Sequence, residues 1–262
     1  MEVRILQNDK KTGKLSFLMK GTQAPFVNAL RRIGMHEVPT LAVEHVEIKK
    51  NNSILYDEMI AHRLGLTPLT TDLESYDLPE KCSCEKQGCA KCQVKLVLKA
   101  KGGVVTADKL KSADPKVNPV HPEMPITKLL KGQEIELEAT AVLGKGKEHS
   151  KWSPGHVWYG QQPIITVNTK SSKYQEMKEK YPPQIFDKKG VIDKNLIIDQ
   201  NLVDACDGIC DDIVKVTYNK DSFIFHVEPF GQLPAKTMVA QASTILNEKL
   251  EAFSANIKDS KD

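Results

Sequence analysis

The chain has 262 residues, of which 40% are hydrophobic, so it can bury one large core or two to three small ones. Its 37 basic and 34 acidic residues are mixed along the chain and leave a formal charge of +3, which argues against a dedicated nucleic-acid binder. Residues 1–14 lack the apolar core of a signal peptide and no apolar run is long enough to span a membrane, so we expect a cytoplasmic protein whose six cysteines stay reduced.

The first elements that the sequence predicts are a hairpin and a helix. Alternating apolar residues flank a polar turn at residues 8–13, which is the pattern of two antiparallel strands over residues 3–19. A helix is expected from Pro25 until Pro39 stops it. Its apolar positions recur at i, i+4 and i+7, namely Phe26, Leu30 and Ile33.

The middle of the chain has strand patterns interrupted by one short helix and a proline-rich stretch. The expected elements are a strand at 43–48, a returning strand at 54–55, a helix at 57–65, and strands at 94–98 and 134–143. The last of these alternates glutamates with apolar residues, so its polar face should point to water. Residues 112–125 are rich in proline and are expected to be extended.

The sequence changes character at residue 171. Residues 171–221 are rich in lysine and aspartate and are interpreted as a small inserted lobe with one or two helices and short strands. A strand follows at 223–227, and the chain ends in its longest helix, which begins at Pro234. That helix carries an apolar stripe made of Met238, Ala242, Ile245, Leu246, Leu250, Phe253 and Ile257.

The C-terminal stripe is longer than the flanking segments can obviously cover. It can pack against the chain's own strands, or it can pack against a second chain. The helical spacing is the same in both cases, so the pattern leaves both alternatives open.

Four of the six cysteines lie between residues 82 and 92. The spacing C-x-C-x4-C-x2-C brings four soft ligands into one short loop, as in tetrahedral structural zinc sites. Gly88 allows a tight turn, and lysines interleaved with the thiols would favour thiolates, namely Lys81, Lys86 and Lys91. We predict a structural zinc site, with disulfides or unliganded thiols as the alternative. The predicted ligands are Cys82, Cys84, Cys89 and Cys92.

An iron–sulfur cluster is a competing occupant, because it also takes four thiolates. The last three thiols of the loop fit part of the plant-type spacing, but the first, Cys82, completes a four-sulfur shell locally and favours zinc. Cys206 and Cys210 are too few for a second such site. They are interpreted as small buried hydrophobes.

The motifs of common enzyme classes are missing from the sequence. Gly144 and Gly146 are not followed by the third glycine of a dinucleotide fingerprint or by the ending of a phosphate loop. His62 and His149 are isolated histidines, and we interpret them as hydrogen-bonding residues of the fold and not as general bases. We therefore expect no catalytic centre in this chain.

Three stretches resemble the alpha-type assembly subunits of cellular RNA polymerases. Residues 25–69 are similar to the N-terminal assembly region of that family, and residues 125–154 to the second signature of its archaeal and eukaryotic branch. Residues 225–246, which read FHVEPFGQLPAKTMVAQASTIL, resemble its closing helix. The stretches occur in the family's order over nearly the whole chain, and the archaeal members of the family are the nearest match.

This resemblance implies an α+β fold with a split dimerisation domain formed by both chain ends, residues 1–46 and 222–262. It implies an inserted, mostly β domain at 47–170, which holds the zinc-type loop, and a small ferredoxin-like α+β lobe at 171–221. Some family members carry an iron–sulfur cluster in that lobe. This chain keeps only two cysteines there, so we expect the lobe without a cluster.

The resemblance also implies partners. The dimerisation domain would pair with the small subunit L, and the pair would recruit the small zinc subunits N and P and the second-largest catalytic subunit. DNA would be reached only through the complete polymerase. The interface with L would use residues of the first and last helices, namely Phe26, Leu30, Ile33, Met238, Ile245, Leu246 and Phe253. The chain would then be a non-catalytic assembly platform for transcription.

Two other functions fit parts of the sequence. An iron–sulfur redox protein would absorb visible light when purified without oxygen. A free-standing zinc-knuckle nucleic-acid binder would show salt-dependent affinity for DNA or RNA in the absence of partners.

Overall fold

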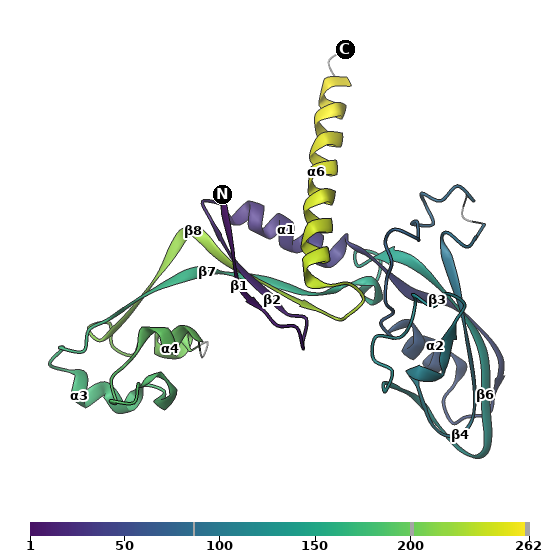
Figure 1. The fold of residues 1–262 in the computed structure, drawn as a ribbon, viewed down its shortest axis with the longest axis horizontal. Coiled ribbons are helices and arrows are strands. Elements are labelled where there is room, and N and C mark those ends of the chain that lie inside the picture. The colour runs from purple at the N-terminus through teal and green to yellow at the C-terminus, as the bar shows by residue number, and fades with distance from the viewer. Residues whose placement is uncertain (86, 200–201, 260–262) are drawn as a thin grey trace. The chain divides into compact units, whose positions relative to one another are not determined.

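The computed structural model describes residues 1–85, 87–199 and 202–259 (Figure 1). The chain divides into two compact units. The smaller unit consists of Met1–Arg4, Leu18–Ala24 and Tyr159–Ile224, and the larger unit consists of Ile5–Phe17, Pro25–Trp158 and Phe225–Asp262. Within the described residues, no helix combines the length and the hydropathy needed to cross a membrane.

The elements form an α+β fold with two sheets, as the sequence predicts. Their order is β1 (Glu2–Asn8), β2 (Leu15–Lys20), α1 (Ala24–His36), β3 (Pro39–Asn51), α2 (Asp57–Gly65), β4 (Gln93–Thr106), η1 (Ala107–Lys109), β5 (Leu110–Ser112), β6 (Pro125–Lys145), η2 (Ser150–Trp152), β7 (Gly155–Val167), α3 (Tyr174–Met177), η3 (Lys178–Lys180), η4 (Pro183–Ile185), α4 (Lys194–Asp199), α5 (Val203–Cys206), β8 (Val214–Pro229) and α6 (Ala235–Asp259). The two sheets have the strand orders β1-β2-β8-β7 and β3-β6-β4-β5.

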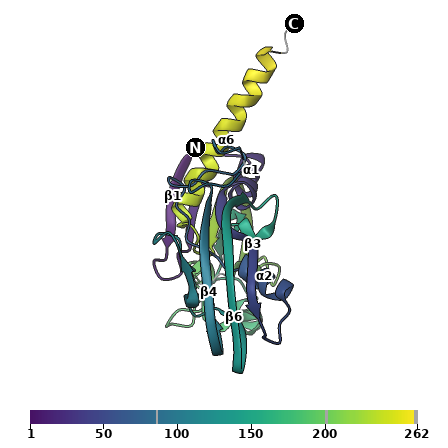
Figure 2. The same ribbon diagram turned by 90° about the vertical axis from the view of Figure 1, so that its right-hand side faces the viewer.

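Strand β6 is the centre of the second sheet, where it pairs antiparallel with β3 and β4 (Figure 2). Its alternation is the one that the sequence predicts, because Ile135, Leu137 and Ala139 are buried while the glutamates between them form ion pairs with lysines of β3 and β4. Such exposed ion pairs contribute little to the stability of the fold. The buried face and the apolar side chains of α2 form the main core of the larger unit.

Residues 54–55 do not form the predicted returning strand. The amide of Asn51 donates to the carbonyl of Leu55 at 2.9 Å, and the Asn51 side-chain oxygen accepts the backbone N–H of Ser53 at 3.0 Å. These bonds close a turn that leads into α2. The prediction was wrong because an asparagine side chain competes with strand pairing for the backbone groups of this segment.

Helices α1 and α6 pack against strands β7 and β8 within the larger unit. A small cavity between them is lined by residues of all four elements, and the rings of Phe17 and Phe225 lie 5.1 Å apart in the adjoining core. Leu30, Ile33 and Met238 are at most 6% exposed. The sequence assigned these three to a partner interface, but the structure buries them within this chain, because one apolar face of each helix covers the chain's own sheet.

The segment between β6 and β7 closes the C-terminal end of α1. The backbone N–H of Lys147 donates to the carbonyl of His36 at 2.8 Å, and the hydroxyl of Ser153 donates to the carbonyl of Met35 at 3.1 Å. The last carbonyls of a helix have no partner inside it, so these bonds satisfy groups that would otherwise be unpaired. The second family-like signature therefore fixes α1 to the second sheet.

The smaller unit contains the lobe that the sequence places at 171–221. Its helices α3, α4 and α5 are short, and among its described residues the strand structure consists of an isolated bridge between Phe186 and Ile192 and the start of β8 at Val214. The lobe has a core of its own, in which Cys206 is fully buried and Cys210 lies at the edge. Buried residues of this core are Tyr174, Tyr181, Ile185, Ile192, Ile197, Cys206, Ile213 and Val214.

Candidate metal centre and exposed apolar helix

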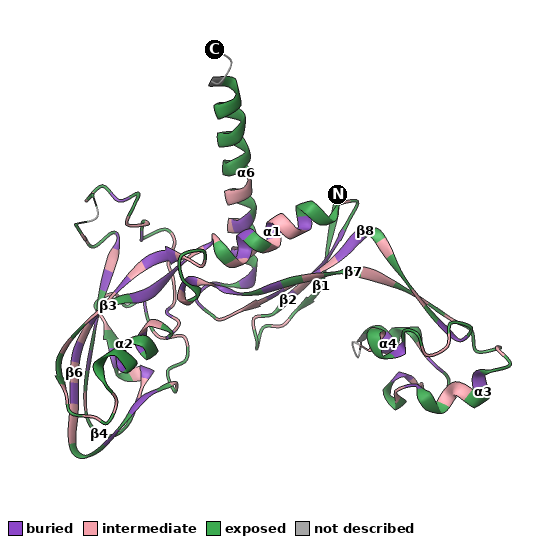
Figure 3. Cartoon of the chain, turned by 180° about the vertical axis from the view of Figure 1, so that it is seen from behind, coloured by how far each residue is buried: buried purple, intermediate pink, exposed green. Residues whose placement is uncertain are grey.

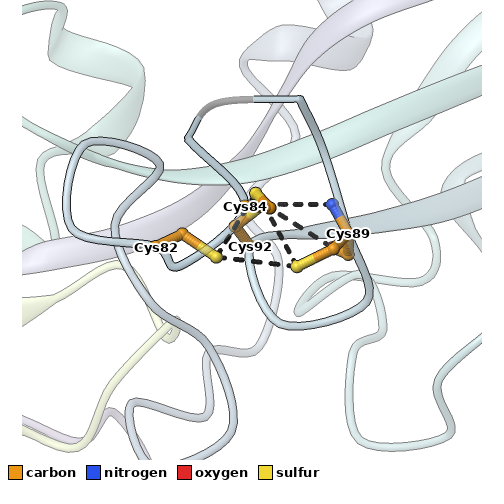
Figure 4. A group of neighbouring side chains, drawn as sticks. All are labelled: Cys82, Cys84, Cys89 and Cys92. Carbon is orange, nitrogen blue, oxygen red and sulfur yellow. Dashed lines mark hydrogen bonds between the residues drawn. The ribbon is translucent and has the colours of Figure 1, made fainter.

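The four cysteines of the loop converge on one point (Figure 4). The Sγ of Cys82 lies 3.5 Å from those of Cys84 and Cys89, and the Sγ of Cys92 lies 3.5 Å from that of Cys84 and 3.9 Å from that of Cys89. All four sulfurs lie within 4.8 Å of one another. In the described part of the chain, no other group of three or more His, Cys, Asp or Glu side chains converges in this way.

These separations fit a tetrahedral metal site. Zinc–thiolate bonds are about 2.3 Å long, so the sulfurs of a regular tetrahedron around zinc lie about 3.8 Å apart. The observed sulfur separations are close to this edge length, and none of the four thiols forms a disulfide. The residues can therefore hold a metal ion without rearrangement of the loop.

The backbone of the loop is shaped to bring the thiols together. The N–H groups of Cys92 and Gln93 both donate to the carbonyl of Cys89 at 3.0 Å, and the N–H of Cys89 donates to the Sγ of Cys92 at 3.3 Å. Gly88 has φ +86°, and a Cβ there would lie 2.6 Å from the side-chain oxygen of Gln93. The expected role of Gly88 in the turn is confirmed.

The electrostatics of the thiols differ from one cysteine to another. The hydrogen bond with the Cys82 thiol lowers the pKa of Cys84 to about 7, whereas burial raises the pKa of Cys92 to about 12. Ligands bind metals as thiolates, so a cation must displace a proton from Cys92. Of the lysines expected to favour this, Lys81 and Lys91 are exposed, and Lys86 lies outside the described residues.

The stripe on α6 divides into a covered and an uncovered part (Figure 3). Met238 and Ala242 are 1% exposed, and Ile245 and Leu246 are half-buried. The next turns of the helix are open, with Leu250 56%, Phe253 63% and Ile257 50% exposed. On α1, Phe26 is 38% exposed.

Two features of this surface were absent from the predicted interface. Leu250 and Ile257 continue the helical spacing and were assigned to the stripe, but the expected contacts did not include them. That spacing was the available signal. His149 lies outside this surface. Its ring nitrogen accepts the backbone N–H of Lys151 at 3.1 Å, so it is a hydrogen-bonding residue of the fold, as the sequence predicts.

Comparison with known proteins gives the family. Residues 46–156 match the family described as the RNA polymerase Rpb3/RpoA insert domain. The chain is 38% identical to DNA-directed RNA polymerase subunit Rpo3 of Methanothermobacter thermautotrophicus, over 94% of this chain and 96% of that protein. It is 37% identical to the Rpo3 subunit of Pyrococcus furiosus, over 98% and 97%, and 35% identical to that of Methanosphaera stadtmanae, over 96% of each.

These relatives match almost end to end, and the resemblance found in the sequence is to this same family of alpha-type subunits. Each of these relatives is named as a subunit of DNA-directed RNA polymerase. The chain belongs to the archaeal Rpo3 family of DNA-directed RNA polymerase subunits.

Proposed function

We propose that the chain is the assembly platform of a DNA-dependent RNA polymerase, that it pairs with the small subunit L, and that the pair recruits subunits N and P and the second-largest subunit. In this proposal the dimerisation domain is formed by residues 1–46 and 222–262, and residues 47–170 and 171–221 are insertions. The chain acts in the cytoplasm and meets DNA only within the polymerase. Its kinship with polymerase subunits supports this over the redox protein and the free-standing nucleic-acid binder.

The exposed end of α6 is the observation that carries the proposal. Leu250, Phe253 and Ile257 lie on one side of the helix and are at least half exposed. A contiguous apolar face of this kind on a long helix is favourable only when another surface covers it. The half-buried Ile245 and Leu246 connect this exposed face to the buried part of the stripe. The face proposed to bind subunit L therefore begins where the chain's own core ends.

The pairing is tested by co-purification of the full chain with subunit L. Phe253→Asp places an uncompensated charge in the proposed seam and should weaken pairing about 100-fold or more. Ala255→Asp introduces the same charge on the opposite side of α6, where residue 255 is also exposed, and should leave pairing unchanged. Equal pairing of the two variants would contradict the proposed interface.

We also propose that Cys82, Cys84, Cys89 and Cys92 hold one zinc ion. Zinc with four thiolate ligands has no open coordination position, so it supplies rigidity and no catalysis. The loop precedes β4 and lies beside the segment that closes α1, so its rigidity would be passed to the assembly surface. The sulfur geometry and the local completeness of the shell support zinc over an iron–sulfur cluster.

The metal is tested with thiol substitutions in the full chain. Cys89→Ser should reduce zinc from about one ion per chain to nearly none, because three thiolates bind much more weakly than four. Cys210→Ser removes a thiol outside the cluster and should retain the ion. Elemental analysis after anaerobic purification measures both, and iron with visible absorbance in place of zinc would overturn the assignment.

A further inference from the structure

A groove runs beside the cysteine loop in the larger unit. One wall is the loop itself, through Gly88 and Cys92, and the other is the end of β6 with the segment that follows it. The groove has a volume of about 310 Å³, at the lower end of the range of small-molecule sites. This size suits one or two side chains of a bound segment.

The floor of the groove is apolar and fixed in place. It includes Val142, Leu143 and the ring of Trp152, which is 7% exposed. The indole N–H donates to the carbonyl of Val142 at 3.2 Å, and the Nζ of Lys151 lies 4.4 Å from the centre of the ring. A floor that is already ordered loses little entropy when it is covered.

The rim of the groove is acidic. The charged residues that line it in the described part of the chain are Glu44, Glu80 and Glu148, and no lysine or arginine is among them. Glu44 forms an ion pair with Lys151. Glu80 and Glu148 are exposed, and their carboxylates make no ion pair or hydrogen bond within the described residues. Two carboxylates beside an apolar floor therefore remain uncompensated.

We propose that this groove receives a segment of another polymerase subunit that presents an apolar side chain flanked by lysine or arginine. The apolar side chain covers Trp152 and Val142, and the cations pair with Glu80 and Glu148, so the contact matches the groove in both polarity and charge. The cysteine loop forms one wall, so the metal centre acts by holding the groove open. This inference rests on the proposed function, because it deepens the role of the chain as a platform.

The groove is tested in polymerase reconstituted from the full set of subunits. Hydrogen exchange should be slower at residues 78–82 and 142–152 in the assembled enzyme than in the free chain. Glu80→Lys/Glu148→Lys should lower the retention of one subunit about tenfold or more and should reduce the salt dependence of that retention. Both positions are exposed, so the variant should fold normally.

The matched control is Glu123→Lys/Glu179→Lys. It makes the same change of charge at two exposed positions that do not line the groove, and it should retain every subunit. Unchanged exchange at the groove, or equal assembly of the two double variants, would overturn the inference, and so would a small molecule found in the groove. If the unaltered chain fails to enter the polymerase at all, the proposed function itself is wrong.

Discussion

Two glycines in the second family-like stretch, residues 125–154, allow it to pack closely against a tryptophan ring and the end of α1. A Cβ at Gly144 would lie 2.3 Å from the ring of Trp152, and one at Gly146 would lie 2.5 Å from the carbonyl oxygen of Met35. The sequence identifies these glycines only as an incomplete nucleotide motif. The structure shows that they leave space for an indole and for the end of a helix, which neither spacing nor composition can predict.

We expect Gly144→Ala to destabilise the chain by about 3 kcal/mol or more, because the added methyl group overlaps the buried indole. Gly160→Ala is the matched control, since it also lies in a strand but a Cβ there meets nothing within 4 Å. Urea unfolding of the two variants measures the difference. Equal free energies of unfolding would show that Trp152 moves aside at no cost.

Asp72 gives a prediction about pH. Its carboxylate accepts hydrogen bonds from the Nζ of Lys116 at 2.6 Å and from the hydroxyl of Ser75 at 2.8 Å, and these hold its pKa well below the usual range. A group with a lowered pKa in the folded state stabilises the fold above its unfolded pKa, about 3.9, and loses that contribution as the pH falls.

The stability difference between the unaltered chain and Asp72→Asn should therefore be constant near neutral pH and shrink as the pH falls below about 4. Asp211→Asn is the control, because that carboxylate has no ion pair or hydrogen bond among the described residues. Urea unfolding at several pH values measures the difference. A gap that grows on acidification would be incompatible with the hydrogen bonds to Asp72.

At the scale of elements, the sequence predicts which face of a strand is buried better than it predicts where the strand begins and ends. The glutamate–apolar alternation of residues 134–143 identifies the buried face of β6, but the strand extends over Pro125–Lys145. Its first part pairs with β4 across a register shift near Gly103, and only the completed sheet supplies those partners. Local pattern thus determines which side is buried, and strand pairing determines where the strand ends.

Truncation of two adjacent residues of β6 should destabilise the chain to very different degrees. Leu137 is fully buried, so Leu137→Ala should cost about 2–5 kcal/mol through lost apolar contact and a cavity. Glu136→Ala loses only an exposed ion pair with Lys99, so it should cost much less stability than Leu137→Ala. Chemical denaturation measures both. Similar losses at the two positions would mean that β6 does not turn Leu137 toward the core and Glu136 toward water.

Periodicity cannot separate the two halves of α6. Met238 and Leu250 belong to the same stripe, yet the first is buried by β7 and β8 and the second is open. An apolar face has the same spacing whether its own chain or another covers it. This is why Leu30, Ile33 and Met238 were expected at an interface although they pack inside. The convergence of the four cysteines was easier to predict, because all four thiols come from one short segment.

At the scale of the whole molecule, the chain is built from units with separate cores. The larger unit holds the cysteine loop and the exposed part of α6, and the smaller unit holds the lobe. The lobe core contains tyrosines, isoleucines and valine, so apolar packing accounts for its order. The interpretation of Cys206 as a small buried hydrophobe fits its full burial.

Damage to the lobe should therefore stay local. Ile197 is fully buried in the lobe and Ile198 beside it is 45% exposed, so Ile197→Ala should speed hydrogen exchange across residues 171–216 much more than Ile198→Ala. Metal content and pairing with subunit L should be unchanged in both variants. Loss of either property in Ile197→Ala would show that the two units fold as one.

The open end of α6 has a consequence for how the cell makes this protein. A newly synthesised copy carries Leu250, Phe253 and Ile257 in water until something covers them, and exposed hydrophobic helices attract chaperones, proteases and one another. The amount of soluble chain in the cell should then depend on the amount of the partner that covers these residues. Overproduced alone it should aggregate or be degraded, so its abundance in the cell would be set by the scarcer companion and not by its own rate of translation.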